Sequence, residues 1–318
     1  MDTNQLYHLS YTLRMDAVRM VHHAKTGHAA PSLSIAEILS VLYFDSMHID
    51  PSRPHWSDRD RFVLSKGHAC PIYYAALARR GFFPAEDLML YRGLNTMLQG
   101  HPDMRKCPGV DMTTGSLGNG LSAAVGMALI GKKDQKNHWI YAITGDGELQ
   151  EGIIWESAMY AGNAKLDNLI VFVDRNGLQS GGSVANIQNL DDLSEKFRSF
   201  GWDTQTIDGH DVEAIRQAIA VAKSRRGTPS VILANTTKGK GVSYMENQYL
   251  WHMKAPNDEQ FAIAMEELQK QNAAKDAEIA KAKAEVEAAK KDLQAAKTAA
   301  KKAAVKSVKS KKAGKAIV

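Results

Sequence analysis

Cysteine is nearly absent from this chain, with only Cys70 and Cys107 among 318 residues. Two cysteines so far apart exclude a disulfide-rich scaffold and a cysteine-based zinc site, and they favour a reduced, cytoplasmic setting. Cys70 has small apolar neighbours and is interpreted as a buried residue rather than a nucleophile. No apolar run approaches the roughly 20 residues that span a bilayer. The N-terminus has neither a basic nor an apolar segment, so we expect no signal peptide and no membrane association.

An excess of basic over acidic residues is lacking outside one end of the chain. Residues 262–318 hold 14 of the 40 basic residues but only 7 of the 35 acidic ones. The rest of the chain is therefore slightly acidic, although the whole carries a formal net charge of +5. A nucleic-acid-binding function would have to rest on the C-terminal segment alone.

The most informative stretch runs from Trp139 to Gln179. Two short apolar segments, Trp139–Ile143 and Leu169–Val173, flank a segment with apolar residues at helical spacing. This pattern predicts two buried parallel strands joined by a helix. Such a crossover brings the carboxyl ends of both strands to the same edge of the sheet.

Ligand-binding residue types follow both strands. Gly145-Asp146-Gly147 follows the first strand, and Asn176 follows the second. Their carboxylate and amide oxygens suit Mg²⁺, and the N-terminus of the following helix favours a diphosphate. Gly-Asp-Gly alone is also typical of a simple turn. Together with an Asn about thirty residues later, however, it matches the thiamine diphosphate signature, and no Gly-x-Gly-x-x-Gly follows a strand to suggest a Rossmann site.

Five further motifs accompany this signature. They are Thr26–Leu33, Arg61–Ala69, Gln99–Pro102, Thr113–Gly120 and Lys238–Gly241. With them, residues 6–268 resemble the N-terminal half of transketolase. The resemblance implies a thiamine diphosphate-binding α/β fold, a doubly wound parallel sheet with helices on both faces.

The resemblance also implies a set of cofactor residues. Asp146, Asn176 and the carbonyl of Leu178 would hold Mg²⁺, or Ca²⁺ or Mn²⁺ in its place. The thiamine diphosphate would be bound by His68, Gly115, Leu117, Asp146, Gly147, Glu151, Asn176 and His252. Glu151 and Glu156 match glutamates that link the two active sites near the dimer axis, so we expect both to be buried and paired.

Four histidines are the expected catalytic residues. His28, His68, His101 and His252 would surround the thiazolium and the donor sugar. With an ordinary pKa near 6.5, they are expected to shuttle protons at neutral pH and to hydrogen-bond sugar hydroxyls.

The resemblance implies one subunit of a split transketolase, which transfers a two-carbon ketol unit from a ketose phosphate to an aldose phosphate. In transketolases the glutamate that activates the cofactor belongs to the pyrimidine domain, which follows the matched segment. The expected partner is therefore a C-terminal transketolase subunit, in an α₂β₂ heterotetramer. Two alternatives stay open: another thiamine enzyme, acting on 2-oxo acids or on a different acceptor sugar, and a non-catalytic module that binds through the basic tail.

Three more strands are expected, at Phe62–Leu64, Gly201–Ile207 and Pro229–Thr236, which makes five strands alternating with helices. An amphipathic helix is predicted at Leu6–Ala24, and Ser34 with Glu37 is predicted to form a capping box for the next helix.

Two domains are expected, a thiamine diphosphate-binding domain over 1–268 and a tail over 269–318. The tail is rich in Ala and Lys, with a seven-residue repeat of apolar residues that includes Met265, Ile279 and Leu293. It is predicted to be helical and then disordered. A solvated helix that frays after Val305, a short coiled coil, and a basic tether for anionic partners are the alternatives.

Overall fold

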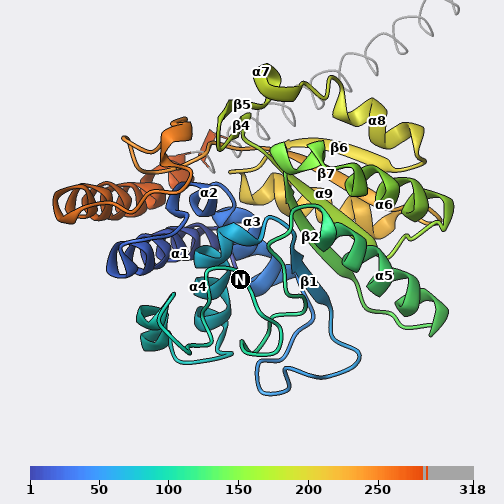
Figure 1. Ribbon diagram of the computed structural model, residues 1–318, viewed down its shortest axis with the longest axis horizontal. Helices are drawn as coiled ribbons and strands as arrows, with labels where there is room; N and C mark the ends of the chain where they lie inside the picture. The colour runs from blue at the N-terminus through green and yellow to red at the C-terminus, as the bar shows by residue number, and fades with distance from the viewer. Residues whose placement is uncertain (282–283, 286–318) are drawn as a thin grey trace, which may run out of the picture. The chain divides into compact units, whose positions relative to one another are not determined.

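A five-stranded parallel sheet, with strand order β1-β2-β3-β7-β6, lies at the centre of the computed structural model, which describes residues 1–281 and 284–285 (Figure 1). The strands are β1 (Arg61–Leu64), β2 (Ile140–Gly145), β3 (Leu169–Arg175), β6 (Asp203–Asp208) and β7 (Ser230–Asn235). All four neighbouring pairs are parallel. The five predicted strands are therefore confirmed, with ends that differ by one or two residues.

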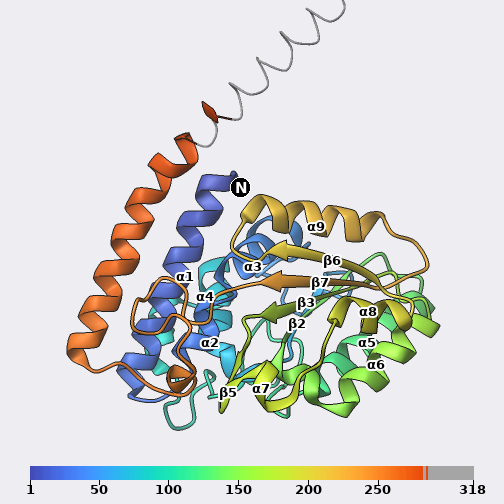
Figure 2. The same cartoon turned by 90° about the horizontal axis from the view of Figure 1, so that it is seen from above.

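Both faces of the sheet are covered, which explains why the central strands are apolar at nearly every position. Alternate residues of β2 enter different cores: Tyr141 and Ile143 pack in one, Ile140 and Ala142 in the other. Figure 2 shows α9 along one face and α5, α6 and α8 along the other. These helices span Asn119–Lys133 (α5), Gly152–Asn163 (α6), Leu193–Ser199 (α8) and Val212–Ser224 (α9). The doubly wound α/β fold predicted from the sequence is confirmed.

The N-terminal helices complete the core on the α9 side. They are α1 (Thr3–Ala24), α2 (Ala29–Leu33), α3 (Ala36–Val41) and α4 (Cys70–Arg80). Helix α1 begins three residues before the predicted start, because Asp2 and Gln5 form a capping box. The smaller helical elements are a π-helical segment at Leu42–Ser46, α7 (Val184–Gln188), and 3₁₀ segments at Gly67–Ala69, Ala85–Leu90, Gly147–Gln150 and Tyr249–Trp251. The strands β4 (Leu178–Gln179) and β5 (Gly182–Ser183) form a small hairpin.

The capping box predicted for Ser34 and Glu37 is wrong. Helix α3 starts after Ile35 with no side-chain cap. The Ser34 hydroxyl instead donates to Asp174 at 2.7 Å, and Glu37 binds Arg14. Both side chains bind residues of distant segments and therefore do not form the local capping box.

Glu37 is the centre of a buried polar network. Arg14 donates two hydrogen bonds of 2.6 Å to its carboxylate, and His210 Nδ1 lies 3.0 Å from it. The Thr237 N–H donates to His210 Nε2 at 2.9 Å, which leaves Nδ1 as the donor to Glu37. Burial alone would raise the pKa of Glu37, but Arg14 and His210 together hold this pKa far below its ordinary value of 4.5.

A helix beginning at residue 258 follows the last strand, and the first compact unit of the chain ends at Asn272. Within this unit the helix lies beside α1 (Figures 1 and 2), and the Gln271 side chain donates to the Gly241 carbonyl at 2.9 Å. The predicted fraying after Val305 and the repeat beyond residue 285 lie outside the described residues. No described helix is both long and apolar enough to cross a bilayer.

Replacing Glu37 by Gln should destabilise the fold by about 3–5 kcal/mol at pH 7, because Arg14 would keep its buried charge without a counter-ion. Since the folded state lowers the pKa of Glu37, its contribution is present above pH 4.5 and is lost as the pH falls below that value. Urea unfolding of both proteins measures the difference. In contrast, removing the exposed Glu195–Arg198 pair with Glu195→Gln should cost less than about 1 kcal/mol. An equally small effect of Glu37→Gln would contradict this account.

Candidate functional site

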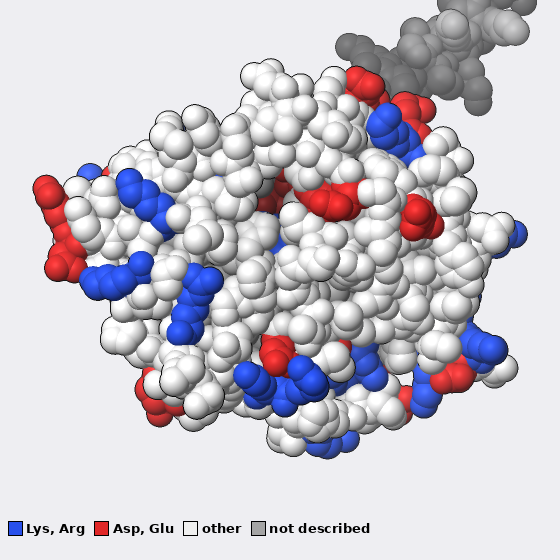
Figure 3. Space-filling model, viewed as in Figure 1, with Lys and Arg blue, Asp and Glu red and all other residues white. Residues whose placement is uncertain are grey.

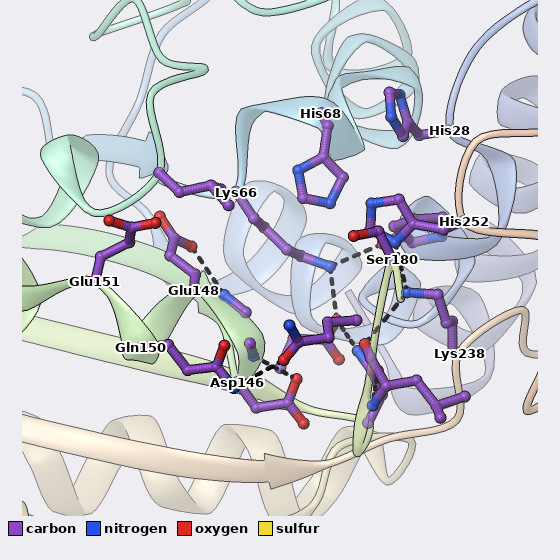
Figure 4. A pocket seen from close by; sticks show the side chains of 18 of the residues that line it. His28, Lys66, His68, Asp146, Glu148, Gln150, Glu151, Ser180, Lys238 and His252 are labelled. Carbon is purple, nitrogen blue, oxygen red and sulfur yellow. Dashed lines mark hydrogen bonds and ion pairs between the residues drawn. The ribbon is translucent and has the colours of Figure 1, made fainter. Parts of the chain in front are cut away.

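A cavity of about 290 Å³ opens at the carboxyl edge of the sheet, where ligands bind in open α/β folds. Segments that follow β1, β2, β3 and β7 line it. Figure 3 shows a recess near the middle of this face in which both acidic and basic atoms are visible. Figure 4 shows three imidazoles on one side of the cavity, Asp146 on the opposite side, and Lys66 and Lys238 between them.

The cavity gathers almost all residues predicted from the sequence. Its lining includes His28, His68, Gly115, Leu117, Asp146, Gly147, Glu151, Asn176, Leu178 and His252. His101 does not line it, although its ring centroid lies 6.5 Å from that of His28. A Cβ added at Gly115 would lie 3.2 Å from the His101 ring, so His101 packs directly behind the cavity wall.

The histidines form one cluster from four separate segments. The ring centroids of His28 and His68 lie 5.1 Å apart, those of His28 and His252 5.5 Å, and those of His68 and His252 4.9 Å. Burial is the main cause that lowers the pKa of His28 to about 4 and that of His252 to about 3, and it also lowers the pKa values of His68 and His101.

Burial thus moves the pKa of each of these histidines below the ordinary value of 6.5 on which the sequence analysis relied, because burial disfavours the charged form. Each neutral ring offers one N–H donor and one nitrogen acceptor. Nδ1 of His28 is buried and has no hydrogen-bond partner among the described residues, so it is available to a ligand.

Asp146 lines the cavity, and backbone N–H groups hold its carboxylate in place. Its two oxygens accept the N–H groups of Gly147 at 2.8 Å and Gly177 at 2.5 Å. Burial, followed by the nearby charge of Asp174, raises the pKa of Asp146 to about 6. A cation bound in front of Asp146 would relieve this penalty and favour the ionised form.

Asn176 is oriented by its neighbours. Its amide nitrogen donates to Asp174 at 2.9 Å, and its amide oxygen accepts the N–H of Leu178 at 3.1 Å. The carbonyl of Leu178 accepts from Lys238 Nζ at 3.3 Å. These two hydrogen bonds fix the orientation of the Asn176 side-chain amide.

The donor set fits a hard divalent cation. Asp146, Asn176 and Leu178 offer one carboxylate, one amide and one carbonyl oxygen, and Mg²⁺ commonly completes such a set with phosphate oxygens and water. In the described part of the chain, no cluster of three or more His, Cys, Asp or Glu side chains is arranged to hold a metal. The arrangement therefore suits a cation shared with a phosphorylated ligand better than a metal held by the protein alone.

Two lysines of the cavity were missed by the sequence analysis. Lys66 Nζ donates to Asp174 at 2.6 Å and to the Pro31 carbonyl at 2.8 Å, so its charge is neutralised. Lys238 Nζ lies 3.0 Å from His252 Nδ1 and forms no ion pair within the described residues. Burial, followed by repulsion from Lys66, lowers the pKa of Lys238 to about 8. Lys238 is thus a buried cation beside a cavity that can accept an anion.

Glu148 was also missed, although it joins three cavity loops. One of its oxygens accepts from the Ser65 hydroxyl at 2.5 Å and from the Gly118 N–H at 2.8 Å. The other accepts from the Gly145 N–H at 3.0 Å. These loops carry His68, Leu117 and Asp146. The sequence offered only one sign that Glu148 connects these loops, which is its position three residues after Gly145.

Glu151 and Glu156 are both exposed in the single chain, contrary to the expectation of burial. Their burial would require a second protein chain, because no described segment of this one covers them. The prediction that they link two active sites therefore stays a prediction.

Comparison with known proteins identifies the family. Residues 7–316 match the model for the transketolase thiamine diphosphate binding domain. The 6-deoxy-6-sulfo-D-fructose transketolase subunit of Clostridium sp. is 48% identical over 268 residues, which cover 84% of this chain and 98% of the relative. An apulose-4-phosphate transketolase subunit of Phocaeicola vulgatus is 38% identical, with 82% of this chain and 95% of the relative covered.

Longer transketolases match over part of their length. The mouse enzyme is 41% identical over 76% of this chain and 38% of its own. The crystal structure of Campylobacter jejuni transketolase superposes with a TM-score of 0.80 at 36% identity, over 85% of this chain and 43% of the other. This chain thus spans about two-fifths of these longer relatives and nearly all of the subunit-type ones. The chain belongs to the transketolase family and corresponds to its N-terminal, thiamine diphosphate-binding part.

Proposed function

We propose that this chain is the diphosphate-binding subunit of a two-subunit transketolase, which transfers a two-carbon ketol unit from a ketose to an aldose. The observation that carries the proposal is the cavity itself. It brings a histidine cluster, an oxygen donor set and the buried cation of Lys238 together at one sheet edge. A 2-oxo acid decarboxylating enzyme would have less use for several neutral imidazoles than an enzyme that binds sugar hydroxyls.

Asp146, Asn176 and the Leu178 carbonyl are proposed to hold Mg²⁺, with the diphosphate supplying further oxygens. Lys238, His68 and His252 are proposed to bind the diphosphate, and Gly147 lets it approach the backbone closely. A Cβ at Gly147 would lie 2.9 Å from the Gln179 side chain, so a larger residue does not fit there without a shift. Gly115, Leu117 and Glu151 are proposed to line the rest of the cofactor site.

Bound thiamine diphosphate supplies the carbon nucleophile that carries the two-carbon unit. The chain's own contribution is to bind and orient the reacting groups. The neutral rings of His28, His68 and His252 can each donate to a sugar oxygen or accept a hydroxyl proton. His28 Nδ1 is the nitrogen with this capacity unused. His28, Lys66 and Lys238 are buried, and a hydrogen bond made at such a site is electrostatically stronger than one in water.

The partner is proposed to be a C-terminal transketolase subunit with the pyrimidine domain and its activating glutamate, in an α₂β₂ heterotetramer. The nearly full-length match to relatives named as subunits supports this. The exposed Glu151 and Glu156 are proposed to become buried in that assembly. Cys70 and Cys107 are unpaired and buried, which supports the proposed cytoplasmic location.

The substrates are proposed to be sugars with a terminal anionic group. The names of the two subunit-type relatives refer to a sulfonated and to a phosphorylated sugar. Sugar phosphates of the pentose phosphate pathway belong to this substrate class. Identifying the acceptor sugar would show whether the enzyme acts in that pathway.

Replacing Lys238 by Met should weaken thiamine diphosphate binding about ten- to hundredfold at pH 7 with Mg²⁺, because a charged hydrogen bond to a buried ligand contributes about 1.5–3 kcal/mol. Lys240→Met is the matched control, since Lys240 lies in the same loop but is partly exposed and 3.8 Å from Glu246. Calorimetric titration measures both affinities. Equal affinities for the two variants would rule out Lys238 as a diphosphate ligand.

The variant Glu148→Gln should lower the affinity for thiamine diphosphate about tenfold or more, since a Gln side chain cannot accept from all three donors and one cofactor loop is released. Excess cofactor should restore the maximal rate, because the reacting residues stay in place. Glu259→Gln, an exposed substitution, is the control. A lost maximal rate with unchanged cofactor affinity would contradict the proposed role.

Ketol transfer from xylulose 5-phosphate to ribose 5-phosphate, with thiamine diphosphate and Mg²⁺, tests the two-subunit proposal. The purified chain alone should be inactive, and its mixture with a C-terminal transketolase subunit should be active, because the activating glutamate comes from the partner. Activity of the chain alone would contradict the proposal.

A further inference from the structure

His210 lies outside the cofactor cavity and connects the loop after β7 to the buried pair of Arg14 and Glu37. It belongs to the segment between β6 and α9, whereas Thr237 follows β7, the neighbouring strand of the sheet. The Thr237 N–H donates to His210 Nε2 at 2.9 Å, and His210 Nδ1 lies 3.0 Å from Glu37. One imidazole therefore links a loop backbone at the sheet edge to a charge pair in the core.

This link matters because Thr237 directly precedes Lys238, the buried cation of the cavity. Figure 4 shows Lys238 beside His252. Lys238 Nζ lies 3.0 Å from His252 Nδ1 and 3.3 Å from the Leu178 carbonyl oxygen. Both neighbours are uncharged, so no ion pair among the described residues holds the ammonium group. Its position therefore depends on the backbone that carries it.

The other hydrogen bonds of this loop do not involve His210. The Thr236 N–H donates to the Arg175 carbonyl at 3.2 Å. The Gly239 N–H donates to the Ala30 carbonyl at 3.0 Å. The Thr237 N–H lies between these two points in the sequence and binds a side chain instead of a carbonyl. A substitution at His210 can therefore remove this one contact and leave the backbone contacts on either side in place.

The orientation and tautomer of the His210 ring are set by Glu37. Because Arg14 donates two hydrogen bonds of 2.6 Å to the Glu37 carboxylate, this carboxylate is ionised and acts only as an acceptor. It therefore binds a protonated Nδ1, which leaves Nε2 of the neutral ring free to accept the Thr237 N–H.

We propose that His210 is a positioning residue for diphosphate binding, which acts by holding the backbone of Thr237 and hence the side chain of Lys238 in the cavity. The inference rests on the proposed function, in which Lys238 binds the diphosphate. His210 itself touches neither cofactor nor substrate. The affinity for the cofactor thus depends on a hydrogen-bond acceptor at the position of His210 Nε2.

The test compares two amide substitutions by calorimetric titration of the purified chain with thiamine diphosphate and Mg²⁺. An Asn side chain places its amide near the position of Nδ1 and a Gln side chain near that of Nε2, so only Gln can still accept from Thr237. His210→Asn should weaken binding about three- to tenfold, as expected for the loss of one hydrogen bond, and His210→Gln should retain most of the affinity. Equal losses in the two variants would overturn the proposal.

A double-mutant cycle with Lys238→Met shows whether the effect passes through Lys238. In the Lys238→Met background, His210→Asn should change the affinity by less than about twofold, because no ammonium group is left to position. An undiminished effect would contradict the proposed role. His22→Asn is the matched control, since His22 Nε2 lies 2.8 Å from the Asp258 carboxylate in a contact that includes no residue of this loop. It should leave the affinity unchanged, and an effect as large as that of His210→Asn would also count against the proposal.

Two measurements need no cofactor and separate this proposal from the proposed function, whose own failure would be the absence of thiamine diphosphate binding by the wild-type chain. The first uses wild-type protein and so does not depend on the folding of a variant: ¹⁵N NMR should show His210 neutral with its proton on Nδ1, and a proton on Nε2 would overturn the proposal. The second is reductive methylation of Lys238, followed by mass spectrometry. It should be faster in His210→Asn than in the wild type, because a released loop exposes the amine, and equal rates would overturn the proposal.

Discussion

The buried ion pair between Lys66 and Asp174 joins the elements of the site. Asp174, at the end of β3, is fully buried and accepts hydrogen bonds from Lys66, Asn176 and two hydroxyls, those of Ser34 and Thr236. One carboxylate therefore connects the loop after β1, the α2–α3 junction and the loop after β7. Because removing one partner of such a pair leaves an uncompensated buried charge, the arrangement tolerates little change. The orientation of the Asn176 amide depends directly on it.

The charges that remain beside this pair explain the chemistry of the cavity. Asp146 has a raised pKa, and Lys238 has a lowered one, because each is buried without a full counter-charge. A divalent cation complements Asp146, and a diphosphate complements Lys238. In the proposed function, the metal and the cofactor would supply the opposite charges, and the neutral histidines would supply hydrogen bonds without adding further charge.

The sequence allowed the sheet and the positions of most site residues to be predicted, for a simple physical reason. Continuous apolar segments identify strands that are buried on both faces, and their carboxyl ends share one edge. The predicted family is confirmed as well. Contacts between distant segments were not predictable: Glu148 binds Ser65 across 83 positions, and Ser34 and Glu37 form tertiary contacts instead of a cap. The low histidine pKa values were missed because they result from burial, which a sequence motif does not record.

The central claim is that this chain alone contains the metal-dependent diphosphate site. Calorimetric titration of the purified chain with thiamine diphosphate and with thiamine, each with Mg²⁺ and with a chelator, tests it most directly. The account predicts binding of thiamine diphosphate that requires Mg²⁺, no comparable binding of thiamine, and competition by inorganic diphosphate. Equal binding of thiamine and its diphosphate, or binding unaffected by the chelator, would contradict it.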